Sequence, residues 1–261
     1  MSDAILKIED LKVYFYSEQG TNRVIDGLNL EIGRSEIRAL VGGSGSGKTL
    51  TGLSILRLQP PQANVIGGKI FWKDKDILEH SDEDMRKIRG KEISMVFQEP
   101  LTSLNPVFTI GYQISEAIRL HTNLKRKEIR EKAIELLRKV RIGQPEKIIS
   151  DYPHQLSGGL RQRVMIAMAI AGNPKLIIAD EPTSNLDVTL QAQILKLFRE
   201  LRDTLNLSIL LITHDLAVVS HLANHVSIMH DGRIIEEGST VDVLDNPKEN
   251  YTKKLIKAVS I

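Results

Sequence analysis

The segment GGSGSGKT at residues 42–49 constrains this chain more than any other part of it. It fits the phosphate-loop pattern G-x-x-x-x-G-K-[ST], in which two glycines, a lysine and a threonine stand at fixed positions. An apolar, β-permissive run over 36–41 precedes it, and apolar residues at helical spacing over 50–58 follow it. This strand, loop and helix context predicts a cradle for a nucleoside triphosphate. A linker rich in Gly and Ser has no reason to place Lys-Thr directly after its last glycine.

Each residue type in this loop has a separate task. Glycines reach backbone angles that other residues resist, and they let successive N–H groups point at phosphate oxygens. The following helix adds the positive end of its dipole, Lys48 neutralises the β and γ phosphates, and Thr49 offers a hydroxyl to Mg²⁺. The predicted nucleotide-binding set is Gly42, Gly43, Ser44, Gly45, Ser46, Gly47, Lys48, Thr49 and Leu50.

The composition narrows the classes of function. The 261 residues suffice for one large α/β domain with an inserted lobe. The net charge is +2 and the charged residues are spread along the chain, so no basic block favours binding to nucleic acid. No cysteine is present, which excludes disulfides, thiolate metal sites and iron–sulfur clusters. No secretory signal is visible at the start, and the longest apolar run, 164–171, is far below the roughly 20 residues that cross a bilayer. A membrane role therefore requires a partner.

The region before and just after the loop is predicted to be rich in β structure. Two strands between about Ile5 and Glu31, joined by a polar turn over 18–22, are expected to form an antiparallel sheet beside the loop. One ring of the cluster 14–16 is a candidate for stacking on a base, the alternative being a core or edge aromatic. Residues 59–68 contain Pro-Pro and Gly-Gly and predict an excursion before a strand over 69–73.

Polar residues follow three short buried-type strands at 93–98, 176–181 and 208–213. The first strand ends on Gln98, and the second ends on Asp180 and Glu181. His214 directly follows the third strand. Parallel strands deliver their carboxyl ends to ligands, so we expect Asp180 to hold Mg²⁺ and Glu181 to polarise water. Gln98 suits a ligand or sensor, and His214 suits a phosphate contact. An acidic turn and a structural histidine are the alternatives.

The middle of the chain predicts helices, with amphipathic stretches over 114–120 and 125–140, and the charges of the second are read as a solvated face. The Ser-Gly-Gly turn at 157–159, which opens a long helix, is a second possible anion site. Asp187 is expected to cap a helix over 188–205. A hairpin turning at 231–232, a short helix near 241–244 and a last helix from about 251 follow, and the remaining histidines, His221, His225 and His230, are interpreted as surface or packing residues.

The order of these parts resembles the ATP-binding subunit of ABC transporters over about residues 5–257. The series is the phosphate loop, Gln98, LSGGL at 156–160, LIIADE at 176–181, SNLD at 184–187 and His214. The resemblance implies an α/β fold: a RecA-like P-loop ABC ATPase core with an antiparallel β subdomain and an inserted helical subdomain. One nucleotide-binding domain then covers 1–261. The core and β subdomain take about 1–99 and 172–261, and the helical subdomain with the signature motif takes about 100–171.

Roles follow from the same resemblance. Lys48 holds the β and γ phosphates, while Thr49, Gln98 and Asp180 serve Mg²⁺. Glu181 is the general base on the attacking water and His214 contacts the γ phosphate, which makes Glu181, His214 and Lys48 the predicted catalytic residues. Ser157, Gly158 and Gly159 form the motif that meets the ATP of a second subunit, Asp187 joins the two sites, and Phe15 is the ring expected to stack on the base.

Within the family, FQEPLTSLNPVFTIGYQI, YPHQLSGGLRQRVMIAMA and NPKENYTKKL resemble the branch that imports oligopeptides, dipeptides or nickel and related metal chelates. Leu160 replaces the glutamine usual at the fifth signature position, and Asn185 stands where a small residue is common. Peptide-type members often carry a C-terminal extension with clustered cysteines. The absence of Cys and the end soon after 251–252 favour a short nickel-type or minimal peptide-type subunit.

The resemblance also implies partners. These are two transmembrane permease subunits, a second ABC ATPase subunit that is identical or paralogous, and an extracytoplasmic substrate-binding protein, with no nucleic acid. The chain is then a peripheral protein on the cytoplasmic face of the cell membrane. Two alternatives stay open, a soluble ABC ATPase acting on ribosomes or nucleic acid and an exporter ATPase. A second phosphate loop or a long heptad run would favour the soluble alternative, and the sequence contains neither.

Overall fold

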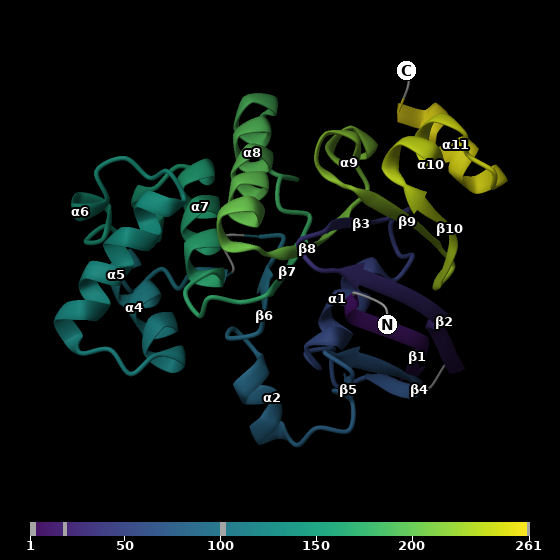
Figure 1. The fold of residues 1–261 in the computed structure, drawn as a ribbon, viewed down its shortest axis with the longest axis horizontal. Helices are drawn as coiled ribbons and strands as arrows, with labels where there is room; N and C mark the ends of the chain where they lie inside the picture. Colours follow the sequence, from purple (N-terminus) through teal and green to yellow (C-terminus); the bar gives the residue numbers. More distant parts are fainter. Residues whose placement is uncertain (1–3, 18–19, 100–102, 260–261) are drawn as a thin grey trace. The chain divides into compact units, whose positions relative to one another are not determined.

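The computed structural model describes residues 4–17, 20–99 and 103–259 (Figure 1). The chain divides into two compact units. One is formed by residues 1–86 and 206–261 and is called the terminal unit here, and the other, 87–205, is called the central unit. Among the described helices, none combines the length and the apolar character that a membrane crossing needs.

The terminal unit contains the predicted antiparallel sheet. Its strands are β1 (Ala4–Ser17), β2 (Gly20–Gly33), β4 (Ala63–Trp72) and β5 (Lys75–Asp76), in the order β2-β1-β4-β5. Of the turn expected over 18–22, residues 18 and 19 lie outside the described residues, and residues 20–22 belong to β2. The inward-facing residues of β1, among them Leu6, Ile8 and Leu11, are fully buried.

The excursion expected over 59–68 was wrong for its second half, because β4 begins at Ala63 and runs through the Gly67–Gly68 pair. The register between β1 and β4 shifts where Gly68 lies, between the pairs Glu9↔Lys69 and Lys12↔Gly67. Gly68 has φ +90°, and a Cβ there would lie 2.5 Å from the carbonyl oxygen of Asp10. The two glycines therefore form a bulge inside a continuous strand rather than a break in it.

The second sheet of the terminal unit carries the phosphate loop. Strand β3 (Ile37–Val41) lies between β8 (Ser208–Thr213) and β9 (His225–His230) and is parallel to both. Strand β10 (Arg233–Ser239) pairs antiparallel with β9 through the predicted turn, where Asp231 and Gly232 both have positive φ. The helices of this unit are α1 (Lys48–Ile55), α9 (Leu216–Leu222), α10 (Thr240–Asp245) and α11 (Asn250–Val259).

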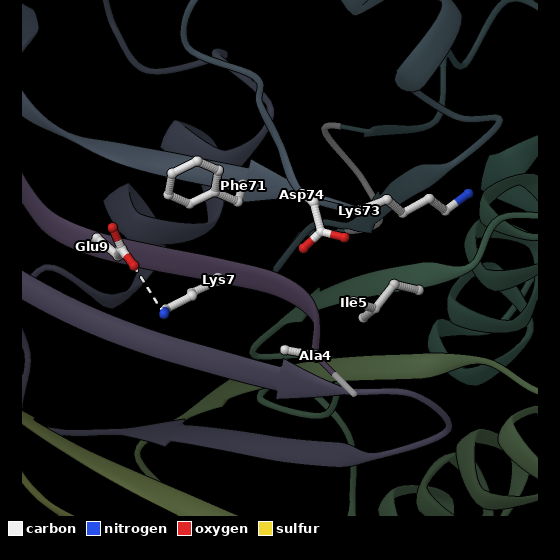
Figure 2. A pocket seen from close by; sticks show the side chains of 7 residues that line it. All are labelled: Ala4, Ile5, Lys7, Glu9, Phe71, Lys73 and Asp74. Atoms are coloured by element: carbon white, nitrogen blue, oxygen red, sulfur yellow. Dashed lines mark ion pairs between the residues drawn. The ribbon is translucent and has the colours of Figure 1, made fainter. Parts of the chain in front are cut away.

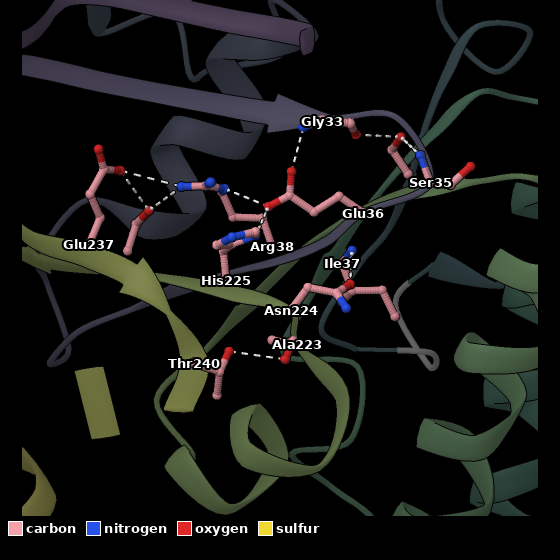
Figure 3. Close-up of polar contacts among 12 residues, drawn as sticks. Gly33, Ser35, Glu36, Ile37, Arg38, Ala223, Asn224, His225, Glu237 and Thr240 are labelled. Atoms are coloured by element: carbon pink, nitrogen blue, oxygen red, sulfur yellow. Dashed lines mark hydrogen bonds and ion pairs between the residues drawn. The ribbon is translucent and has the colours of Figure 1, made fainter. Parts of the chain in front are cut away.

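Polar contacts hold the start of β3, at the end away from the loop (Figure 3). The Glu36 carboxylate accepts hydrogen bonds from Gly33 N–H at 2.5 Å and from Arg38 Nε at 3.0 Å, and His225 Nδ1 lies 2.9 Å from it. Asn224 Oδ1 accepts Ile37 N–H at 3.0 Å. The strand that leads into the phosphate loop thus starts from a fixed base.

The central unit contains the parallel pair β6 (Ile93–Val96) and β7 (Leu176–Asp180). Its helices are α4 (Ile110–His121), α5 (Arg126–Lys139), α6 (Pro145–Ile148), the short 3₁₀ helix η1 (Pro153–Gln155), α7 (Gly158–Ala169) and α8 (Val188–Leu205). Helix α2 (Asp82–Ile88) crosses the boundary between the two units in the sequence. The helical subdomain is expected over about 100–171, and residues 100–102 lie outside the described residues.

Candidate functional site

The phosphate loop joins β3 to α1, as the sequence predicted. Its first glycine, Gly42, passes so close to the end of β9 that a Cβ would lie 2.2 Å from the carbonyl oxygen of Met229. Its last glycine, Gly47, is the N-cap of α1 in the left-handed region at φ 105°, and a Cβ there would lie 2.9 Å from Val24 O. Both positions therefore require glycine for the fold of the chain itself.

The loop offers hydrogen-bond donors that suit an anion. Lys48 is buried, and its ammonium group donates to the carbonyl oxygens of Gly42 and Gly43 at 2.9 Å each. The Ser46 hydroxyl is buried without a hydrogen-bond partner among the described residues. Helix α1 begins beside the left-handed Gly47, so the positive end of its dipole lies at the loop. A buried cation, an unsatisfied hydroxyl and a helix N-terminus in one turn fit the phosphates of ATP.

His214 lies at the same sheet edge as the loop. The last residues of β3 and β8, Val41 and Thr213, are paired in parallel register, so Gly42 and His214 follow neighbouring strands. The His214 side chain is exposed, and Asp215 caps α9 by accepting the N–H groups of Ala217 and Val218. The terminal unit thus brings the phosphate loop and His214 together at the carboxyl ends of two parallel strands.

Phe15 lies in the antiparallel sheet, half-buried, opposite Asn22 of β2 and Ala63 of β4. This sheet approaches the loop through β2, since Val24 and Ile25 come within 3.3 Å of the Cβ position of Gly47. Phe15 therefore lies on the sheet that approaches the loop, but on the strand next to the one that makes the approach. Of its neighbours in sequence, Tyr14 is buried and Tyr16 is exposed.

A pocket of about 230 Å³ on the same sheet, lined by Lys7, Glu9, Phe71 and Lys73 among others, contains none of the predicted site residues (Figure 2). Its Lys7 ammonium and Glu9 carboxylate form an ion pair at 2.9 Å. We assign this pocket no part in nucleotide binding.

In the central unit, too, predicted site residues lie at the carboxyl ends of two parallel strands, and here two of them are acidic. Val96 of β6 pairs with Ala179 of β7, so Gln98 and the pair Asp180–Glu181 leave the same edge. Strand β6 ends two residues earlier than the predicted 93–98, and Gln98 is exposed in the segment that follows. Asp180 is 3% exposed, while Glu181 is half-buried. Carboxylate and amide oxygens of this kind are the ligand atoms that Mg²⁺ prefers.

Glu181 has an unusual backbone. Its φ of 45° is left-handed, which costs an L-residue with a side chain roughly 1 kcal/mol or more. The carbonyl oxygen of Glu181 accepts two hydrogen bonds from Ser184, one from its N–H at 3.2 Å and one from its hydroxyl at 3.1 Å. This turn holds the strained residue in place, and strain of this kind gathers at functional sites.

The Ser-Gly-Gly turn at 157–159, called the signature turn here, begins α7. Ser157 is the N-cap, and its Oγ accepts the N–H of Leu160 at 3.4 Å. Because that bond uses an oxygen lone pair, the hydroxyl keeps its own hydrogen to donate. Ser157 and Gly158 are exposed and Gly159 is buried. The guanidinium of Arg163 donates to Val140 O at 2.9 Å and to Gln193 Oε1 at 3.0 Å, which anchors α7 within the central unit.

Three predicted parts of the central unit line one pocket of about 360 Å³. They are Gln98, Gly158 and the turn 184–186. Asp187 follows that turn and caps α8 as predicted, because its Oδ1 accepts Leu190 N–H at 3.0 Å. Gln98, the signature turn and the segment before Asp187 are therefore neighbours, although they are far apart in the sequence.

Sequence reasoning missed two residues that contact or support the phosphate loop. Tyr251 Oη accepts the N–H of Gly43 at 3.0 Å, and the ring of His230 stacks on the ring of Tyr251 with centroids 3.9 Å apart. The sequence predicts residue 251 as the start of the last helix and as part of NPKENYTKKL, and His230 as a surface or packing residue, with no contact to the loop. Nothing in the local sequence of either residue signals this contact.

Comparisons with known proteins point to one family. The family model described as ABC transporter matches residues 25–184. A probable peptide ABC transporter ATP-binding protein of Sinorhizobium fredii is 47% identical over 259 residues, covering 99% of this chain and 77% of that protein. An oligopeptide transport ATP-binding protein of Bacillus subtilis is 48% identical over 258 residues, covering 98% of this chain and 79% of that protein.

Solved structures show the same fold. The cbiO1 protein of Clostridium perfringens, part of an ABC transporter complex, superposes with a TM-score of 0.81 at 29% identity, covering 99% of this chain and 95% of that chain. The ATP-binding cassette MJ0796, solved as a dimer bound to ADP and phosphate, superposes with a TM-score of 0.80 at 26% identity, covering 90% and 98%. The expected α/β fold, with a RecA-like core, is confirmed.

Proposed function

The chain belongs to the ABC transporter family, and from that premise we propose that it is the ATP-hydrolysing subunit of an importer of peptides. The family binds and hydrolyses ATP, and the phosphate loop with its buried Lys48 is the observation that carries the proposal for this chain. The names of the relatives favour peptides over nickel or other metal chelates as cargo. They give no support to the soluble ribosomal or nucleic-acid ATPase considered from the sequence.

We assign the chemistry to residues of both units, which together form a single nucleotide-binding domain in this proposal, with residues of about 100–171 as its helical subdomain. Lys48 neutralises the β and γ phosphates, and the His214 side chain contacts the γ phosphate. Glu181 takes a proton from the attacking water, which raises the nucleophilicity of that water. A base placed by a strained backbone is held ready before the substrate arrives.

A divalent cation fits the donor set. Thr49 hydroxyl, Gln98 amide oxygen and the Asp180 carboxylate are hard oxygen ligands, and Mg²⁺ is commonly held by one carboxylate together with phosphate oxygens. When bound, the ion would offset the negative charge that develops as the bond to the leaving phosphate breaks. We therefore propose these three residues as its ligands, and ATP with Mg²⁺ as the working substrate.

We also propose that two ATPase subunits act together. In this arrangement Ser157 and Gly159 bind the γ phosphate of the ATP held mainly by the other subunit, and Asp187 links the two sites. The hydroxyl hydrogen that Ser157 retains and the helix N-terminus behind it are suited to that contact.

An exposed aromatic surface supports a permease partner. Phe108 lies just before α4 and Tyr112 lies in it, and their rings stack with centroids 4.5 Å apart. Val107 beside them is 69% exposed. Apolar rings that remain at the surface are typical of a protein interface. We propose that this segment, which follows Gln98 in the chain, docks a transmembrane subunit on the cytoplasmic face of the membrane. An extracytoplasmic binding protein then delivers the cargo.

Glu181→Gln tests the proposed base. We expect ATP affinity to stay within about threefold and turnover to fall by at least about 100-fold, because the amide cannot accept the proton. Binding is measured by equilibrium titration and turnover by phosphate release. The control is Glu200→Gln, which removes a carboxylate that pairs with Arg141 on the surface of the central unit. Unchanged steady-state hydrolysis in Glu181→Gln would remove this residue from the mechanism.

Lys48→Ala tests the cradle. A charge-assisted contact to phosphate is lost, so ATP affinity is expected to fall by about 100-fold, while the exposed Lys75→Ala leaves it unchanged. An ATP dissociation constant equal to that of the wild type would contradict the role of Lys48.

Affinity purification from detergent-solubilised membranes tests the transport assignment. Tagged wild type is expected to retain two polytopic subunits, a second ATPase and a peptide-binding protein, identified by mass spectrometry. The double variant Phe108→Ser, Tyr112→Ser is expected to bind ATP normally and to lose the permease subunits. Recovery of ribosomal or nucleic-acid proteins in place of the polytopic subunits would overturn the importer.

A further inference from the structure

The phosphate loop is held from outside by the C-terminal part of the terminal unit. Gly43 N–H donates to Tyr251 Oη at 3.0 Å, and Gly232 N–H, from the β9–β10 turn, donates to Ser46 O at 3.2 Å. These bonds join residues about 200 positions apart in the sequence. A loop rich in glycine has many accessible conformations, so outside bonds of this kind determine which one it adopts.

Tyr251 is itself firmly placed. It lies at the start of α11, next to a turn whose N–H groups, from Lys248 and Glu249, are accepted by the Glu236 carboxylate at 2.7 and 3.1 Å. Its ring packs against the buried cluster around Val41 and Ile228 and stacks on His230 at an interplanar angle of 20°. The hydroxyl is therefore held at a defined position beside the loop.

One peptide plane connects this hydroxyl to the phosphate-binding lysine. The N–H of Gly43 and the carbonyl of Gly42 belong to the same peptide group, which is planar and trans, so they point in opposite directions. Tyr251 holds the N–H side at 3.0 Å, and the carbonyl side accepts the Lys48 ammonium at 2.9 Å. Rotation of this peptide would break both bonds together.

We propose that Tyr251 is a positioning residue for ATP binding, acting on Lys48 through the Gly42–Gly43 peptide. The proposal rests on the proposed function, since it assumes that Lys48 binds phosphate. The N–H of Gly43 is then committed to the tyrosine and is not a phosphate ligand, which removes Gly43 from the direct contacts expected from the sequence. The C-terminal helix α11 becomes a structural support of the nucleotide site.

Tyr251→Phe tests this contact, because it keeps the ring and the stack on His230 but removes the acceptor. We expect the dissociation constant of Mg-ATP to rise about fivefold in the wild-type background, the effect of one neutral hydrogen bond, and less than about 1.5-fold in Lys48→Ala. Tyr14→Phe is the matched control, since it removes a hydroxyl that donates to Asp26 at 2.7 Å in the same unit. It is expected to lower the melting temperature and to leave ATP affinity unchanged.

Hydrogen exchange at the Gly43 amide, followed by NMR without nucleotide, measures the contact itself. We expect exchange to be at least tenfold faster in Tyr251→Phe than in wild type or Tyr14→Phe. Equal exchange rates, or the same loss of ATP affinity with and without Lys48, would overturn the proposal. If the wild type bound no ATP, the proposed function would fail, and the exchange rates would still decide whether Tyr251 holds the loop.

Discussion

The phosphate loop of the terminal unit and the signature turn of the central unit are both Gly-rich turns that open a helix, yet their glycines meet different demands. A Cβ on Gly42 would lie 2.2 Å from a backbone oxygen, so the chain itself forbids a side chain there. A Cβ on Gly158 would meet, among the described residues, only Leu186 Cδ2 at an ordinary 3.8 Å.

The requirement for glycine has a different origin in the two turns. The phosphate loop is shaped by its own unit, through Met229, Gly232 and Tyr251. The exposed Gly158 is not required by the packing of its own chain. A glycine that its own chain does not need agrees with the proposal that this turn meets ATP and a second subunit.

Alanine at Gly42 and at Gly158 gives the sharpest test of the comparison. Gly42→Ala is expected to lower the free energy of unfolding by about 3 kcal/mol, because the new methyl group meets backbone rather than a flexible side chain. Gly158→Ala is expected to leave stability unchanged or raise it by up to about 1 kcal/mol, since it replaces glycine in a helix, and to reduce ATP turnover. Urea unfolding and phosphate release measure the two effects. Equal losses of stability in the two variants would show that packing does not require glycine at 42 more than at 158.

Ser157→Ala separates the capping role of this hydroxyl from a phosphate contact. Loss of a cap with a long 3.4 Å bond is expected to cost about 0.5–1 kcal/mol of stability, and loss of a phosphate ligand to reduce turnover at least tenfold. Ser239→Ala is the control, because Ser239 caps α10 in the same way by accepting Asp242 N–H at 3.1 Å. A turnover equal to that of the control would leave Ser157 as a cap alone.

The smallest expected effect concerns the acid sensitivity of the support under Tyr251. Burial raises the pKa of Glu236, but several hydrogen bonds to its carboxylate, led by the Lys248 N–H, act together with the positive charge of Lys248 and hold this pKa below its ordinary value. A carboxylate with a lowered pKa stabilises the fold above its unfolded pKa of about 4.3, and the contribution is lost as pH falls through the folded pKa.

Glu236→Gln is therefore expected to cost about 1 kcal/mol or less at pH 7, because the site is partly solvated. The difference in unfolding free energy between wild type and variant should begin to narrow below about pH 4.3 and should be lost once the pH lies below the lowered pKa of the folded protein, where the wild-type carboxyl is neutral too. Urea titrations of both proteins from pH 7 to pH 3 measure it. A difference that stayed constant with pH would show that the charge of Glu236 does not support this turn.

Much of the fold was predictable because its signals are local. The strand–loop–helix order at 37–55, the apolar strand before Asp180 and the hairpin turn at 231–232 each follow from residue type and spacing over a few positions. The bulge at Gly67–Gly68 was not predictable, because a glycine pair in a sequence indicates the end of a strand. Only the pairing of β4 with β1 shows that the strand continues through the pair. The strand ending at Val96 rather than Gln98 depends likewise on where its partner stops pairing.

The sequence alone determined which residues are candidates for the chemistry of this protein. A phosphate-loop lysine, two carboxylates after an apolar strand and a Ser-Gly-Gly helix start are recognisable as residues, because their chemistry depends on their own side chains and spacing. Only the tertiary structure decided that Gln98, Gly158 and the turn 184–186 are neighbours, that Gly42 rather than Gly158 is required by packing, and that the Tyr251 hydroxyl bonds to the loop. Those facts arise from contacts between segments up to about 200 residues apart, and no local pattern encodes them.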